Sequence, residues 1–138
     1  MSMRKTFTFV LMDPPFETSR ISTAMRMMSC AAEQGHSLQV FAYEGSVFLA
    51  LAQQKAHANL VHGHNEQEES HPLTKDWIAA LQRETEKQGA HFEWINCGLC
   101  AAERGALDYI PGVKTGSPAD LVRFTESSDN VVVIPTRG

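Results

Sequence analysis

Residues 94–105 read Trp-Ile-Asn-Cys-Gly-Leu-Cys-Ala-Ala-Glu-Arg-Gly, and the rest of the chain is organised around them. The residues just before, 90–95, alternate between polar and apolar side chains roughly as a strand does, and the residues after Gly98 have a helix-forming composition. Cys97 is therefore expected where a strand passes into a helix. Unpaired backbone N–H groups and the positive end of a helix dipole favour an anion there, so a thiol at this position tends toward the reactive thiolate.

Length and composition restrict the class of protein. A chain of 138 residues, 43% of them hydrophobic and 20% charged, fits one compact α/β domain spanning residues 1–138. The net charge of −4 and the absence of a run of Lys and Arg argue against nucleic acid as a partner. No segment approaches the roughly 20 apolar residues of a membrane span. Three cysteines are an odd number, which favours a reducing, cytoplasmic compartment over a disulfide framework.

Hydrophobic periodicity and end signals predict the order of the elements. Near-continuous apolar strands are expected at 6–12, 36–43 and 130–134, in addition to the strand that leads to Cys97. Helices are expected at about 20–34, 46–54, from Pro72 or Thr74 to just before Gly89, and at 117–127, with a loop at 106–116. Strands that alternate with helices are typical of βαβ units with parallel strands, so the fold class is α/β.

The polar segment at about 55–73 contains four histidines and an acidic run at 66–69. A stretch of this length without regular structure is either functional or mobile. His62 and His64 are candidate metal ligands, because neutral imidazole binds zinc, copper or nickel. Their spacing matches no zinc module, and the alternative is a solvated loop that contains histidines. Cys30, inside the first helix, is interpreted as a small buried side chain.

Four interpretations of Cys97 and Cys100 stay open on the residues alone. The pair could contribute to a metal site, but it supplies only two of the four ligands of tetrahedral zinc. It could be a dithiol that exchanges with a disulfide, as in thioredoxin, although there the motif follows an early strand. It could be two inert cysteines in a turn. The fourth interpretation is a nucleophilic thiolate that carries sulfur as a persulfide, which a strand-to-helix junction would stabilise.

The pattern Cys97-x-x-Cys100-x-x-x-Arg104-Gly105 resembles the DsrE/DsrF-like family of sulfur-relay proteins. The likeness is nearest to the YchN-like branch, which carries both cysteines, and is more distant to TusD, which keeps only the first. Weaker features agree with it: a proline-containing loop before the first helix, a Gly-His before the second strand, a Gly-Val-x-x-Gly turn at 112–116 and an Asp-x-Val at 129–131.

This resemblance implies a mostly parallel five-stranded sheet with helices on both faces, assembled as a trimer or hexamer. It also implies that Cys97 is the persulfide nucleophile, which accepts sulfur from a donor protein and passes it to an acceptor protein without a cofactor. Cys100 is then a candidate resolving thiol. Arg104 is a candidate charge stabiliser for the thiolate, although its side chain could equally face solvent. The histidine-rich segment at 57–71 is longer than the resemblance leads us to expect.

Overall fold

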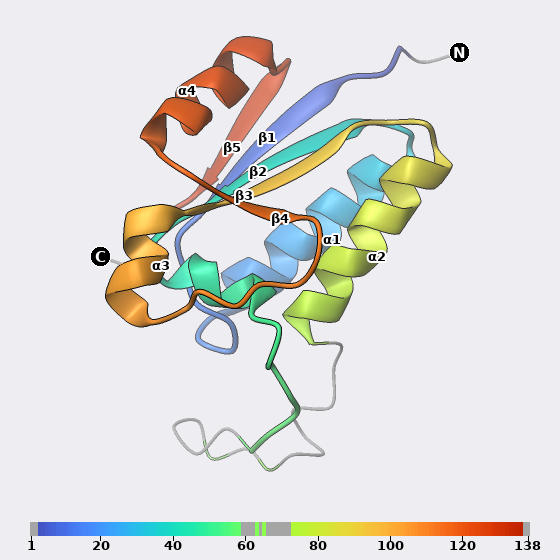
Figure 1. The fold of residues 1–138 in the computed structure, drawn as a ribbon. Coiled ribbons are helices and arrows are strands. Elements are labelled where there is room, and N and C mark those ends of the chain that lie inside the picture. The colour runs from blue at the N-terminus through green and yellow to red at the C-terminus, as the bar shows by residue number, and fades with distance from the viewer. Residues whose placement is uncertain (1–2, 59–62, 64, 66–72, 137–138) are drawn as a thin grey trace.

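The computed structural model describes residues 3–58, 63, 65 and 73–136 of the chain. Its described strands form one all-parallel sheet in the order β4-β3-β2-β1-β5, as Figure 1 shows. The expected α/β fold with a five-stranded sheet is confirmed, and the sheet is parallel throughout. The elements in chain order are β1 (Thr6–Leu11), α1 (Ser19–Glu33), β2 (Ser37–Ala42), η1 (Glu44–Ala50), α2 (Thr74–Lys87), β3 (Phe92–Cys97), α3 (Gly98–Arg104), β4 (Val113–Gly116), α4 (Pro118–Ser127) and β5 (Asn130–Ile134).

Parallel pairing brings the carboxyl ends of the strands to one edge of the sheet. Leu11 of β1 lies opposite Ala42 of β2, and Cys97 of β3 lies opposite Gly116 of β4. The connections that leave this edge lead into α1, η1, α3 and α4. In open α/β sheets this edge is where ligands usually bind, because it collects loops from several strands. The cysteine motif therefore lies at the edge most suited to chemistry.

One face of the sheet is covered by α1 and α2, which lie side by side in Figure 1. The apolar residues of α1 point inward because they recur at helical spacing, and they pack on the large core side chains of β1, β2 and β3. The expected ends of α1 are confirmed. The Thr18 hydroxyl caps the first turn, and Gly35 follows the last turn with φ of 86°.

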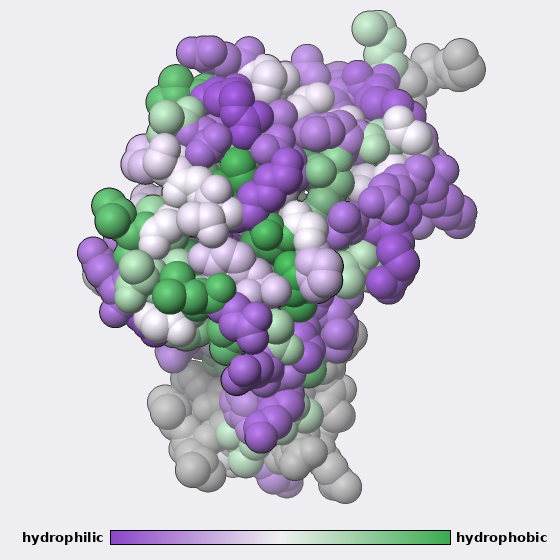
Figure 2. Space-filling view, viewed as in Figure 1, coloured by the Kyte–Doolittle hydropathy of each residue, from purple (hydrophilic) through white to green (hydrophobic). Residues whose placement is uncertain are grey.

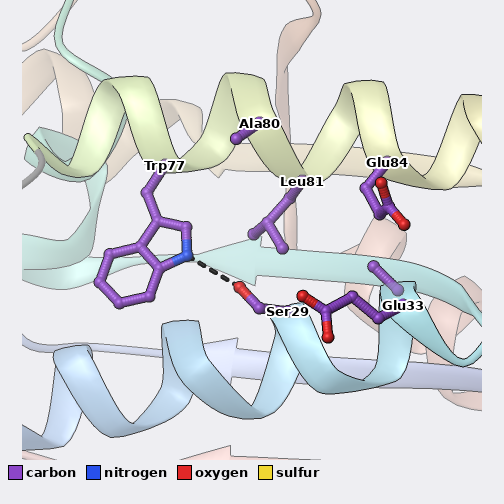
Figure 3. Close-up of a pocket in the computed structure, with 7 residues that line it drawn as sticks. Ser29, Glu33, Trp77, Ala80, Leu81 and Glu84 are labelled. Carbon is purple, nitrogen blue, oxygen red and sulfur yellow. Dashed lines mark hydrogen bonds between the residues drawn. The ribbon is translucent and has the colours of Figure 1, made fainter.

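The two helices on this face contact each other through Trp77 of α2. Its indole Nε1 donates a hydrogen bond to the Ser29 hydroxyl of α1 at 2.8 Å. Figure 3 shows the indole directed toward α1, with the carboxylates of Glu33 and Glu84 farther along the same groove. Trp77 is half-buried and packs on the margin of the core, as its place in the apolar stripe of α2 predicts.

The opposite face is covered by α4, which Figure 1 shows on the far side of the sheet from α1 and α2. Ser117 begins this helix with a capping box, and Pro118 occupies its first turn, as the sequence predicts. Phe124 is the fully buried residue of α4, and it packs against Phe41 and Ile95 of the sheet. Phe124, together with the partly buried Leu121, therefore provides apolar contact between α4 and this face.

A buried carboxylate adds a polar anchor on the same face. Glu93 of β3 has only 9% of its side chain exposed, and it accepts two hydrogen bonds from the Arg123 guanidinium of α4, at 2.9 and 3.3 Å. Lys114 of β4 lies 3.7 Å away. The hydrogen bonds from Arg123 hold the pKa of Glu93 below its ordinary value, although burial opposes them.

This network predicts how stability depends on acid. A carboxyl group whose pKa is lower in the folded state stabilises the fold above its unfolded pKa, which is about 4.3 for Glu, and this contribution is lost as the pH falls through the folded value. We expect Glu93→Gln to make the free energy of unfolding less dependent on pH below about pH 5. Urea titrations from pH 3 to pH 7 measure this, with Glu126→Gln on the exposed side of α4 as the control. Equal acid dependence in both variants would contradict the prediction.

Two segments differ from the sequence prediction. The expected loop at 106–116 contains the edge strand β4, Val113–Gly116, whose backbone pairs with β3. Four residues flanked by glycines carry too little periodicity to indicate a strand. The helix expected at 46–54 is instead the 3-10 helix η1, Glu44–Ala50. This tighter helix begins two residues earlier because Glu44, at φ of 52°, turns the chain directly after β2.

The interpretation of Cys30 as a buried side chain is wrong, because this residue is exposed. Met28 and Ala32 lie on the inner face of α1, and Cys30 lies midway between them, about 200° around the helix from each. Its thiol therefore faces away from the α1 residues that pack on the sheet.

Candidate functional site

Cys97 is the last residue of β3 and the N-cap of α3, as predicted for a strand-to-helix junction. Its backbone is extended, and the helix begins at the next residue. The side chain is 7% exposed and packs with Phe41, Ile95 and Phe124. A thiol in this position has the free N–H groups of the first turn of α3 beside it and apolar side chains beneath it.

Two glycines bound the helix α3, Gly98 at its start and Gly105 after its end. A Cβ on Gly98 would lie 3.0 Å from the Thr115 methyl of β4, so the neighbouring strand leaves little space for a larger residue. Gly105 ends α3 in the left-handed region, with φ of 68°. The result is a seven-residue helix that presents both cysteines at its amino-terminal end.

Cys100 lies in the first turn of α3, half-buried and in contact with Cys97. Burial raises the pKa of the Cys100 thiol above its ordinary value, and the hydrogen bond to Cys97 and the charge of a Cys97 thiolate raise it further. The backbone N–H of Glu44 acts in the opposite direction and favours the thiolate. Both thiols are free.

Arg104 lies in the last turn of α3, where its guanidinium pairs with a residue of the β2–η1 turn. Its Nη2 lies 2.6 Å from Glu44 Oε2, and its Nη1 donates to the Cys100 carbonyl oxygen at 3.3 Å. A second carboxylate, that of Glu103, lies 3.6 Å from Nη1. Its expected role as a charge stabiliser for the thiolate stays a prediction, because the described contacts of Arg104 join it to Glu44, Glu103 and its own helix.

Glu44 is the residue of this site that sequence reasoning missed. It lies at the same sheet edge as Cys97, but 60 residues separate it from Arg104. Asp13, at the end of β1, has a structural role nearby: its buried carboxylate accepts from Thr18 at 2.9 Å, and its carbonyl accepts from Ser46 at 2.6 Å. These bonds tie the first loop to α1 and η1.

The histidine-rich segment contributes little to the described structure. His62 and His64 lie outside the described residues. His57 is described, and its ring packs edge-on against Phe16 with ring centres 4.9 Å apart. No group of three or more His, Cys, Asp or Glu side chains arranged to hold a metal occurs within the part of the chain that is described. None of the described helices is long and apolar enough to cross a membrane.

These features define a class of small α/β proteins with an all-parallel sheet and a Cys-x-x-Cys pair at its carboxyl edge. The chain belongs to the DsrE/DsrF-like family, whose model matches residues 5–134. The family resemblance expected from the cysteine pattern is thereby confirmed.

Relatives and solved structures agree with this assignment over nearly the whole chain. An uncharacterized protein of Methanopyrus kandleri is 30% identical over 91% of this chain and 90% of its own length. Another, from Methanocaldococcus jannaschii, is 27% identical over 91% of this chain and 96% of its own. The crystal structure of the ychN protein from E. coli matches with a TM-score of 0.67 at 22% identity, covering 95% of this chain and 99% of that one. This last likeness is one of fold.

Proposed function

We propose that this protein is a sulfur carrier that holds sulfane sulfur as a persulfide on Cys97. The observation that supports the proposal most directly is the place of Cys97, which is the last residue of β3 and the N-cap of α3. Free N–H groups at a helix start favour a thiolate and would favour a persulfide anion for the same reason. Family membership is consistent with this activity.

Loading is a transfer between two sulfur atoms. The Cys97 thiolate attacks the outer sulfur of a donor persulfide, R–S–SH. The S–S bond of the donor breaks, R–S⁻ leaves, and Cys97–S–SH forms. No external oxidant or reductant is needed, because the sulfane sulfur moves at the same oxidation level. An acceptor thiolate then takes the sulfur from Cys97 by the same reaction.

Cys100 is suited to a different step. Burial and the neighbouring Cys97 raise the pKa of the Cys100 thiol above its ordinary value, which makes Cys100 a poor first nucleophile. After loading, a Cys100 thiolate can attack the inner sulfur of Cys97–S–SH. The Cys97–Cys100 disulfide forms, HS⁻ leaves, and a dithiol reductant later restores both thiols. The two cysteines then act in sequence, first as carrier and second as resolving thiol.

The proposal is tested by incubating the reduced protein with a low-molecular-weight persulfide and measuring intact mass. One or more added sulfur atoms, mapped by peptide mass spectrometry to Cys97, are expected. A protein that acquires no sulfur, or acquires it on Cys30 alone, would contradict the proposal.

A dithiol oxidoreductase is the second candidate function, favoured by the contact between the Cys97 and Cys100 thiols. It predicts a reversible Cys97–Cys100 disulfide with a reduction potential of roughly −200 to −270 mV, the range of glutaredoxins and thioredoxin. Redox titration followed by mass spectrometry measures this potential. An activity of this kind requires both cysteines, whereas sulfur loading requires only Cys97.

Cys100→Ser separates loading from release. We expect the variant to accept sulfur on Cys97 as well as the unmodified protein does but to release no sulfide without an external thiol, because the resolving nucleophile is missing. Sulfide is measured colorimetrically after the donor has been removed. Spontaneous sulfide release at an unchanged rate would exclude Cys100 as the resolving thiol.

The partners of this activity are sulfur donor and acceptor proteins. Leu99, between the two cysteines, is 75% exposed, and Leu107 follows at 65%. Figure 2 shows apolar surface over α3 and the segment after it, which would contact a docked protein.

We also propose a homo-oligomer, a trimer or hexamer, through the edge strand β5. Its Val131 and Val133 are 42% and 51% exposed. Light scattering after size exclusion tests the oligomer.

A further inference from the structure

The first residue of η1, Glu44, has a backbone conformation that is rare for its residue type. Glu44 has φ of 52°, in the left-handed region that glycine occupies more readily. The next residue, Gly45, is held against the first loop, because a Cβ on it would lie 2.8 Å from Cδ of Pro14. The Ser46 amide donates to the Tyr43 carbonyl at 3.1 Å and closes the turn. The surrounding contacts thus fix Glu44 in this conformation.

This conformation directs two groups of Glu44 toward α3. Its backbone N–H favours the Cys100 thiolate and so acts to lower the pKa of that thiol, and its carboxylate pairs with Arg104 at 2.6 Å. Arg104 in turn donates to the Cys100 carbonyl oxygen at 3.3 Å. The Arg104 side chain therefore links Glu44 to the backbone of Cys100, the second cysteine of the motif.

We propose that Glu44 is a positioning residue for Cys100: its left-handed backbone holds its carboxylate against Arg104, and this ion pair tunes the charge that the Cys100 thiol experiences. The inference rests on the proposed function, because it concerns the step in which Cys100 resolves the persulfide. Glu44 and Arg104 then act as a pair with opposite effects on one thiol. Loss of the carboxylate removes a negative charge, whereas loss of Arg104 leaves that charge unbalanced.

The other ionisable groups around Cys100 are few among the described residues. Cys97 is in direct contact with it. Tyr43 and Tyr109 belong to the two apolar clusters that include Cys100. On α4, which packs on the same cluster as Cys97, Arg123 pairs with Asp120 at 3.2 Å and with Glu93. A substitution at Glu44 or Arg104 changes none of these residues, so the same neighbouring groups surround the Cys100 thiol in every variant.

The test isolates the Cys100 thiol. In a Cys30→Ser/Cys97→Ala background Cys100 is the only cysteine of the chain, and its alkylation by iodoacetamide is followed by mass from pH 6 to pH 10. Since only the thiolate reacts, the rate at a pH below the midpoint reports its population. We expect Glu44→Gln to raise this rate about two- to fivefold and Arg104→Gln to lower it by a similar factor, with both effects reduced by added salt.

Two control variants test whether the effect on Cys100 alkylation comes from the Glu44 carboxylate. Glu103→Gln removes another carboxylate that contacts Arg104 but is 72% exposed, and it should leave the midpoint of alkylation unchanged. Glu44→Gly keeps the left-handed turn without the carboxylate and should match Glu44→Gln. If Glu44→Gln and Arg104→Gln shift the midpoint in the same direction, or if neither shifts it, the proposal is overturned.

The ionisation of Cys100 can be measured whether or not the protein carries sulfur, so the two hypotheses fail separately. Opposite shifts in the two variants, together with an unmodified protein that loads no sulfur, would support the role of Glu44 and reject sulfur carriage. The converse result, sulfur on Cys97 with an unmoved midpoint for Cys100, would reject only the role of Glu44.

Discussion

Replacing Cys97 by serine is expected to reduce sulfur loading to background. A serine hydroxyl is close in size to the thiol but does not ionise at neutral pH, so the variant keeps the junction between β3 and α3 and loses the nucleophile. Cys100 does not substitute for it, because burial raises the pKa of the Cys100 thiol above its ordinary value and so reduces its thiolate population at neutral pH. Intact mass after incubation with the persulfide donor measures the effect.

Cys30→Ser is the matched control for this experiment. It makes the same chemical change at an exposed cysteine of α1, outside the two clusters that contain Cys97 and Cys100. We expect the control to load as the unmodified protein does. A Cys97→Ser variant that loads normally would reject the carrier role of Cys97, and a loss of loading in Cys30→Ser alone would place the acceptor at Cys30.

The elements that the sequence predicted well are those whose signals are local. The cap of α1 at Thr18 and its end before Gly35 follow from two residues with strong preferences. The start of α4 follows from Ser117 and Pro118 in the same way. The place of Cys97 follows from a change of period over a dozen residues. Each of these signals determines the backbone conformation within a few residues of itself, so the sequence alone is enough to predict the element.

The features that the sequence did not predict depend on contacts between distant segments. Strand β4 is defined by its pairing with β3, and its own four residues carry no alternation. The Glu44–Arg104 pair joins residues that are 60 positions apart, and nothing near Arg104 indicates which carboxylate it meets. The sequence therefore could not indicate that Arg104 pairs with Glu44, and the role of Arg104 as a charge stabiliser for the thiolate stays a prediction.

The largest loss of stability is expected from Phe124→Ala. Phe124 is fully buried and joins α4 to Phe41 and Ile95 of the sheet, and the Arg123 guanidinium lies over its ring at 4.9 Å. Truncating a buried phenylalanine removes its apolar contacts and leaves a cavity, which costs about 3–5 kcal/mol. The free energy of unfolding from urea denaturation measures the change, with the m-value as a check on two-state behaviour.

Val122→Ala on the same helix is the matched control, because Val122 is 56% exposed and its truncation should change stability by no more than about 0.5 kcal/mol. The Phe124→Ala substitution should also affect the candidate site, because Cys97 packs in the same apolar cluster as Phe124. A cavity beneath Cys97 should admit water and reagents, so iodoacetamide should alkylate Cys97 faster in folded Phe124→Ala than in Val122→Ala. Equal stability and equal alkylation rates in the two variants would mean that α4 neither anchors this face nor shields the candidate sulfur carrier.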